Sequence, residues 1–91
     1  MITAIVFIRC DVDRISAVAE EIAGLEGVSE VYSVTGGIDL VTMVRVRELD
    51  EVATVVADRV NKVTGVTSTK THIAFRTYSR HDLEAAFSLG L

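Results

Sequence analysis

The chain has 91 residues, of which 49% are hydrophobic, with 13 acidic and 9 basic side chains, a net charge of -4 and a pI near 5.0. This length predicts one domain, and the scattered basic residues exclude the positive face that nucleic-acid binding needs. No apolar run reaches the roughly 20 residues of a membrane span. A single cysteine, Cys10, excludes a disulfide framework and a cysteine-based metal site. We therefore expect a cytoplasmic protein without cofactor, metal or membrane partner, in which Cys10 is a packing residue.

The first expected element is a strand over Thr3–Arg9 that is apolar on both faces. Ala4 and Val6 lie on one face, and Ile5 and Phe7 lie on the other. A strand that is apolar on both faces is typically buried on both. Since helices are expected to cover one face only, the sheet of a second subunit is expected to cover the other, which predicts a two-fold dimer.

The remaining elements alternate between helical and strand-like patterns. A helix is expected over Val12–Gly24 and a second over Leu49–Lys62, because apolar residues recur there with helical spacing. Runs of β-branched residues predict strands over Val28–Thr35, Leu40–Arg47 and Val66–Thr77. The first helical stripe comprises Ile15, Val18, Ala19, Ile22 and Leu25, and the second comprises Leu49, Val52, Val56, Val60 and Val63.

The two halves of the chain repeat each other at a separation of 38 residues. Arg9 matches Arg47, and the pair Gly27-Val28 matches Gly65-Val66. Each half reads strand–helix–strand, so the chain is predicted to form a βαββαβ unit of the α+β class. This is a ferredoxin-like sandwich, a four-stranded antiparallel sheet with two helices on one face. Right-handed crossovers place the first and third strands in its centre.

The C-terminal segment is predicted to form a short helix outside this domain. We assign residues 1–78 to the domain and 79–91 to the tail. Ser79-Arg80-His81-Asp82 has the spacing of a capping box, and Leu83 and Phe87 share one helical face. A helix this short is marginal alone, so it is expected to dock onto the domain or a neighbouring subunit, with a disordered terminus as the alternative.

A polar turn, Val34-Thr35-Gly36-Gly37-Ile38-Asp39-Leu40, separates the second and third strands and predicts a β-hairpin. The adjacent glycines leave their amides uncovered, and such amides bind carboxylates. Asp39 nearby is suited to an ammonium group, so the turn has groups for both charged ends of an amino acid. The alternative is that Gly36 and Gly37 only make the turn and Asp39 caps it.

The fourth strand offers polar side chains on both faces. Thr69 and Thr71 have hydroxyls that suit a polar ligand, although threonines are also simply good strand formers. His72 lies on the other face with no nucleophile or metal partner near it in the sequence, so we interpret it as structural. Tyr32 and Arg45 are interpreted as interface or rim residues.

These motifs, in this order, resemble the effector-binding domain of Lrp/AsnC-type transcriptional regulators, also called the regulation of amino acid metabolism (RAM) domain. The resemblance rests on the βαββαβ order, the turn from Val34 to Leu40, and Gly65-Val66 followed by Thr69-Lys70-Thr71-His72-Ile73. It covers about Ile2 to Thr77. The family turn is roughly Thr-Gly-x-Tyr/Phe-Asp-Leu, and this chain has Ile38 where an aromatic residue is common.

The resemblance implies a sensor of amino acids or related small metabolites that binds them where dimers meet in octamer-like rings. The ligand-binding residues that it implies are Thr35, Gly36, Gly37, Asp39, Thr69 and Thr71. Full-length regulators add a helix-turn-helix domain that this sequence lacks. The chain is therefore expected to be a stand-alone module without direct nucleic-acid binding, acting alone or with a full-length regulator.

An enzyme is the alternative class, because small dimeric α+β-barrel monooxygenases and isomerases share this architecture. His72, Tyr32 and Arg45 would then supply an acid, a donor and an anion-binding group. No pair of titratable residues has the spacing of an acid and base that act together, so we expect no catalytic residues. A purely structural or partner-binding module is the third alternative.

Overall fold

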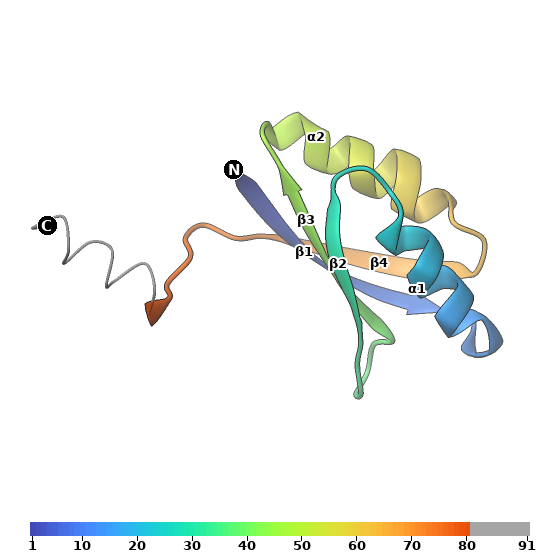
Figure 1. The fold of residues 1–91 in the computed structure, drawn as a ribbon. Coiled ribbons are helices and arrows are strands. Elements are labelled where there is room, and N and C mark those ends of the chain that lie inside the picture. The colour runs from blue at the N-terminus through green and yellow to red at the C-terminus, as the bar shows by residue number, and fades with distance from the viewer. Residues whose placement is uncertain (81–91) are drawn as a thin grey trace, which may run out of the picture.

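A computed structural model describes residues 1–80 of the chain, and the remaining residues, which hold most of the expected tail helix, lie outside the described part (Figure 1). Three short helical segments flank or extend the two α-helices: η1 (Val12–Arg14), η2 (Thr54–Arg59) and η3 (Val60–Lys62). The main elements are β1 (Ile2–Cys10), α1 (Ile15–Ala23), β2 (Val28–Ser33), β3 (Leu40–Val46), α2 (Leu49–Ala53) and β4 (Val66–Ile73).

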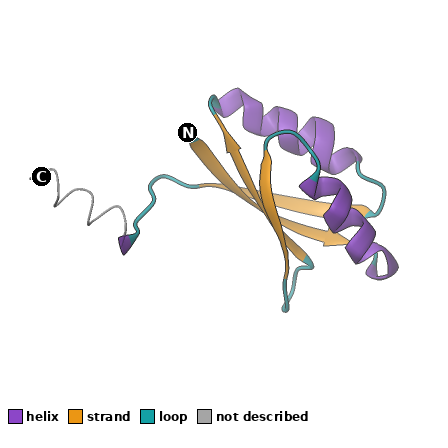
Figure 2. Cartoon of the chain, viewed as in Figure 1, coloured by secondary structure: helices purple, strands orange, loops and turns teal. Residues whose placement is uncertain are grey.

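The four strands form one antiparallel sheet in the order β2-β3-β1-β4. Both helices cover the same face of this sheet, and its other face is left open in the single subunit (Figure 2). The ferredoxin-like sandwich predicted from the repeat is therefore confirmed, with the first and third strands in the centre. No helix in the described part of the chain is long and apolar enough to cross a membrane.

The core lies between the sheet and the helices. Ala4, Val6 and Ile8 of β1 are wholly buried and pack under Val18 and Ile22 of α1. This is the period-two pattern of a strand meeting the apolar stripe of a helix. Of the alternate side chains of β1, which face the open side, Thr3, Ile5 and Phe7 are half-buried and Arg9 is exposed in one subunit.

The second helix departs from the expected apolar stripe. Leu49 is 59% exposed, while Val55, which the expected stripe omits, is only 1% exposed. Val55 follows the buried Val52 by three residues, about one helical turn, so it lies on the same buried face. The expected place of Leu49 in the core is wrong, because Leu49 is the first residue of α2 and lines the groove between α2 and β4 instead.

The loops that leave the two helices each need a glycine. Gly27 has φ +93° and Gly65 has φ +104°, as expected for helix exits. Space is also limiting, because a Cβ on Gly27 would lie 2.5 Å from Cγ2 of Val55 and one on Gly65 would lie 2.9 Å from Cγ2 of Val18. These glycines let the loops pass close under the helices.

The fourth strand ends earlier than the sequence predicted. It was expected to reach Thr77 but ends at Ile73, after which the amide of Ala74 still donates to the carbonyl of Thr3 at 2.9 Å. Because β4 runs antiparallel to β1, the residues after Ala74 run past Ile2, where β1 begins, and have no strand to pair with. Phe75 and Tyr78 are therefore highly exposed, at 99% and 80%.

Candidate functional site

The hairpin turn between β2 and β3 projects from the sheet, with its glycines exposed (Figure 1). Gly36 has φ +112° and no atom lies within 4 Å of a Cβ built on it, so it is needed for its backbone conformation rather than for space. Gly37 has no positive φ, and a Cβ on it would lie 3.7 Å from Nη2 of Arg9. Gly37 is therefore an exposed residue that lies beside a guanidinium group.

Asp39 closes the base of this turn. Its carbonyl accepts from the amide of Val34 at 3.1 Å, and its own amide donates to the carbonyl of Ile8 at 3.0 Å. The side-chain Oδ2 accepts a hydrogen bond from the amide of Cys10 at 2.9 Å. One carboxylate oxygen thus satisfies a backbone donor at the β1 bulge between Arg9 and Cys10. Asp39 caps the end of β1 and brings a negative charge to the turn.

A depression of about 710 Å³ lies next to the turn, on the open face of the sheet. It includes Phe7 and Arg9 of β1, Ile38 of the turn, and Lys70 and His72 of β4. Arg9 and Lys70 give it two positive charges at the same end as the turn glycines. The hollow therefore combines an apolar wall with cations that suit a carboxylate.

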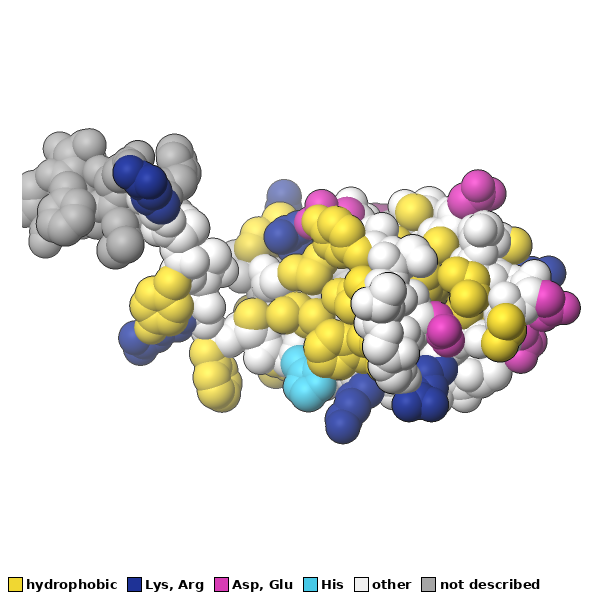
Figure 3. Space-filling model, turned by 90° about the horizontal axis from the view of Figure 1, so that it is seen from below, with side chains coloured by type: hydrophobic (Ala, Val, Ile, Leu, Met, Phe, Trp, Pro, Cys, Tyr) yellow, Lys and Arg dark blue, Asp and Glu magenta, His cyan; other side chains and the backbone are white. Residues whose placement is uncertain are grey.

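Figure 3 views the molecule from below, with the hairpin pointing toward the reader. Hydrophobic side chains gather over the sheet beside the hairpin, and histidine and basic side chains lie at their margin. On the open face Ile5 and Phe7 of β1 and Val41 and Met43 of β3 are half-buried in the single subunit. This half-covered apolar surface adjoins the depression.

The expected site residues fall into two places. Thr35, Gly36, Gly37 and Asp39 lie together in the turn, whereas Thr69 and Thr71 lie on β4 across the central strands. The hydroxyl of Thr69 donates to Oδ1 of Asn61 at 2.8 Å, toward η3, although Thr69 also lines the depression.

Thr71 lies apart from the turn. It lines an apolar groove of about 300 Å³ between α2 and β4, together with Leu49 and Ile73. Within one subunit, therefore, the turn residues and Thr71 do not face the same cavity.

Arg9 is the residue that the sequence reasoning missed. It appeared there only as a position of the internal repeat, matched to Arg47. The available signal was the alternation of β1, which places Arg9 on the same face as Ile5 and Phe7, and the hairpin, which returns β3 beside β1. Together they put a cation beside Gly37.

The three residues of the enzyme alternative do not meet within one subunit. Tyr32 lies on the edge strand β2 and His72 on the opposite edge strand β4, so about three strand spacings, roughly 14 Å, separate them. His72 packs edge-on against Phe7, with ring centroids 5.1 Å apart. This contact agrees with its interpretation as a structural residue.

Tyr32 and Arg45 are both held by Glu30. Nη1 of Arg45 lies 3.2 Å from Oε1 of Glu30. A hydrogen bond from Tyr32, and then that from Arg45, lowers the pKa of the Glu30 carboxyl, while the same bond to Glu30 raises the pKa of Tyr32. These are surface pairs on the rim of the open face, and Tyr32 stays a neutral phenol at neutral pH.

Cys10 is a buried free thiol, as expected for a packing residue. Burial, followed by the neighbouring charges of Asp39 and Asp11, raises the pKa of this thiol. A raised pKa keeps the sulfur protonated and unreactive at neutral pH. Among residues 1–80, no cluster of His, Cys, Asp and Glu has the arrangement of a metal site.

Comparisons with known proteins agree with the four-stranded, two-helix fold described above. At the level of structure the chain is similar to the protein TTHA0845 from Thermus thermophilus, with 48% identity and a TM-score of 0.83 over 88% of this chain and 100% of that one. It shares its fold, at 14% identity and a TM-score of 0.77, with the transcriptional regulator NMB0573 of Neisseria meningitidis, solved as an L-Met complex. That match covers 87% of this chain and 53% of the regulator.

At the level of sequence the chain is 38% identical over 78 residues to an uncharacterized HTH-type transcriptional regulator of Pyrococcus abyssi. The match covers 82% of this chain but 52% of the relative, so the chain spans about half the length of that regulator. The family model of the Lrp/AsnC ligand binding domain matches residues 3–83. The protein therefore belongs to the Lrp/AsnC ligand-binding domain family, whose members act in transcription regulation.

Proposed function

We propose that this domain senses an amino acid or a related small metabolite, which binds at the hairpin turn and the adjoining depression. The ligand carboxylate is bound by the amides of Gly36 and Gly37 together with the guanidinium of Arg9, and its ammonium by Asp39. The observation that carries this proposal is the position of Arg9, because a Cβ on Gly37 would lie 3.7 Å from Nη2 of Arg9. Backbone amides and a guanidinium fork are both strong carboxylate ligands.

The charges of the turn favour a zwitterion over a simple anion. Asp39 contributes a negative charge within the same turn, and among residues 1–80 only its Oδ2 is engaged, by the amide of Cys10. Its second oxygen can accept from an ammonium group in a charge-assisted hydrogen bond. Arg9 and Lys70 lie on the side of the depression where the carboxylate would bind. Thr35 and Thr69 are secondary contacts in this proposal.

A second copy of the chain completes the site. Ile5, Phe7, Val41 and Met43 form an apolar surface on the open face, and two such faces bury each other in a two-fold dimer. Because Thr71 lies in a different cavity from the turn of its own subunit, it can contribute only from another subunit. Association of dimers into a ring would bring such a contribution to the turn.

The sensing role is regulatory rather than catalytic. A cytoplasmic location fits a metabolite sensor related to transcription regulators. The net charge of -4 argues against DNA binding by this domain itself. In this proposal the domain signals through assembly, either with copies of itself or with a full-length Lrp/AsnC-type regulator that shares the dimer face.

A thermal-shift screen with each standard amino acid tests the proposal, because a ligand of the folded state raises the melting temperature by mass action. Calorimetry on a ligand so identified then compares two variants. Gly37→Val covers the amide without backbone strain, since Gly37 has no positive φ, and should abolish binding. Asp39→Asn keeps an acceptor for Cys10 but removes the charge, and should weaken binding by about ten- to a hundredfold.

The matched control is Gly24→Ala, at a glycine that lies outside the turn and where a Cβ would meet only ordinary van der Waals contacts. Every variant must keep the oligomer size of the parent. Unchanged affinity in both Gly37→Val and Asp39→Asn would contradict the site. Failure of every amino acid to stabilise the parent would contradict the amino-acid ligand.

A further inference from the structure

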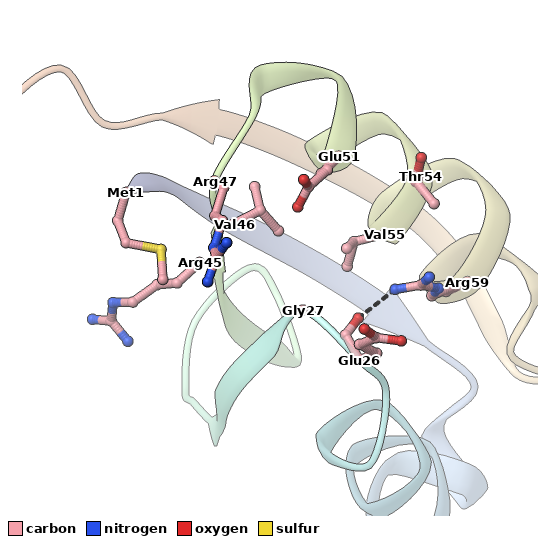
Figure 4. A pocket seen from close by; sticks show the side chains of 10 residues that line it. All are labelled: Met1, Glu26, Gly27, Arg45, Val46, Arg47, Glu51, Thr54, Val55 and Arg59. Atoms are coloured by element: carbon pink, nitrogen blue, oxygen red, sulfur yellow. Dashed lines mark hydrogen bonds between the residues drawn. The ribbon is translucent and has the colours of Figure 1, made fainter.

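A second depression, of about 430 Å³, lies at the opposite end of β3 from the hairpin turn (Figure 4). β3 runs away from the turn and ends at Val46, so the two ends are roughly 20 Å apart for a strand of this length. The depression is walled by Arg47 after β3, by Glu26 and Gly27 between α1 and β2, and by one face of the second helix. It shares no lining residue with the depression at the turn.

The walls of this depression are fixed by close contacts. A Cβ on Gly27 would lie 2.5 Å from Cγ2 of Val55, so the loop passes directly against the helix. The carbonyl of Gly27 accepts from the amide of Arg45 at 3.0 Å, and that of Glu26 accepts from Nη1 of Arg59 at 2.7 Å. The hollow is thus held in place by strand, loop and helix together.

The charged groups around the hollow are only partly used by the protein itself. Arg59 uses one of its five N–H donors on Glu26, and in the part of the chain described here the side chains of Arg47 and Glu51 make no hydrogen bond or ion pair. Figure 4 shows the Glu51 carboxylate directed from the helix toward the space that Arg47 enters from β3, with Arg59 further along the same helix. Val46 and Val55 supply a buried apolar floor.

We propose that this hollow is a second binding site, for a small zwitterion that carries one carboxylate and one ammonium group. Arg47 binds the carboxylate, since a guanidinium fork matches its geometry. Glu51 binds the ammonium and disfavours phosphates and other dianions by like-charge repulsion. The site goes beyond the hairpin site and is independent of it.

The test uses the full chain carrying Gly37→Val, in which the hairpin amides are covered. Each standard amino acid is added in a thermal-shift assay, with acetate, inorganic phosphate and ethylamine as singly functional probes. We expect at least one amino acid to raise the melting temperature, and the three probes to have no comparable effect. Calorimetry with that amino acid then compares Arg47→Gln and Glu51→Gln in the same background.

Arg47→Gln should weaken binding by about tenfold or more, and Glu51→Gln should do the same while relieving the repulsion of acetate and phosphate. The matched controls, Lys62→Gln and Asp50→Asn, change exposed charges that do not line the hollow and should leave affinity unchanged. Phosphate or acetate binding as well as the amino acid would overturn the zwitterion assignment. So would equal affinity in Arg47→Gln and its parent.

The outcomes also separate the two sites. An amino acid that stabilises the wild-type chain but never the Gly37→Val variant supports the hairpin site and overturns this one. An amino acid whose binding survives Gly37→Val but is lost in Arg47→Gln supports this site and overturns the hairpin site for that ligand. No stabilisation of either protein overturns both.

Discussion

Asp39 and Cys10 are joined by a hydrogen bond from the Cys10 amide to the Asp39 carboxylate, 2.9 Å long, across 29 residues of sequence. The bond lies where β1 bulges between Arg9 and Cys10 and its amides leave the regular ladder. Asp39 therefore has two roles in one residue. It satisfies a backbone donor of the central strand, and it carries the negative charge that we assign to ligand binding.

The first prediction separates those two roles by stability. Asp39→Ala removes the acceptor of a partly buried amide and should destabilise the fold by about 1–3 kcal/mol. Asp39→Asn retains an acceptor oxygen and should lose less than half as much. Thermal melting at one fixed protein concentration measures both, because about 1 kcal/mol shifts the midpoint of a domain this size by about 4–8 °C. Equal melting temperatures for the two variants would show that the hydrogen bond contributes nothing.

The second prediction concerns the loop glycines. Gly27→Ala places a Cβ 2.5 Å from Val55 Cγ2 at a φ of +93°, so it should destabilise the protein by about 1–3 kcal/mol. Gly24→Ala is the matched control, since Gly24 follows the same helix at φ -86° with only ordinary contacts. It should be neutral or slightly stabilising.

A double variant isolates the clash at Gly27 from the strained φ. Adding Val55→Ala to Gly27→Ala removes the obstructing methyl group, so the pair should cost less than the sum of the single changes. Denaturant unfolding of the four proteins gives this coupling. Strict additivity would mean that the φ strain alone, and not the contact with Val55, requires glycine.

The third prediction arises from a buried hydroxyl. Thr42 of β3 is fully buried among apolar side chains, and its Oγ1 is a buried side-chain atom with no hydrogen-bond partner in the described residues. Thr42→Val has nearly the same shape and removes this polar atom, so it should stabilise the fold by about 1 kcal/mol. Thr42→Ser keeps the hydroxyl and loses a methyl group, so it should destabilise. A lower melting temperature for Thr42→Val would indicate that the hydroxyl has a partner.

Sequence patterns were sufficient to predict most of this fold, for identifiable physical reasons. Gly27 and Gly65 recur at the same place in both halves because the loop after each helix needs a positive φ and passes close to a valine of the other helical segment. The stripe of the first helix was right because α1 has regular geometry. The second stripe was partly wrong: Leu49, the first residue of α2, is exposed, and Val55, one turn after the buried Val52, lies in the core instead.

The candidate site was less predictable than the fold. Gly36, Gly37 and Asp39 are contiguous in sequence, so a local motif was enough to group them. Arg9 joins them only through the pairing of β1 with β3, which is a long-range relationship. Thr71 was grouped with the turn by family resemblance, but within one subunit it lies in a different groove.

The last prediction distinguishes the two faces of β1. Val6 is wholly buried beneath the helices, whereas Phe7 faces the open side and is half-buried in one subunit. An aspartate at position 6 would bury an unpaired charge in every state of the protein, so Val6→Asp should abolish folding. An aspartate at position 7 remains solvated in a monomer, so Phe7→Asp should instead separate the subunits.

Circular dichroism and sedimentation equilibrium measure the two effects independently. We expect Phe7→Asp to keep the parent's secondary structure while its mass falls toward that of one chain, 9.9 kDa. Arg45→Ala, at the exposed rim of the same face, is the control that should keep the parent's mass. A monomeric parent at micromolar concentration would remove the basis for a dimer through this face. A folded Phe7→Asp variant with the parent's mass would place the subunit contact elsewhere, because a charge cannot be buried between two apolar sheets without a partner.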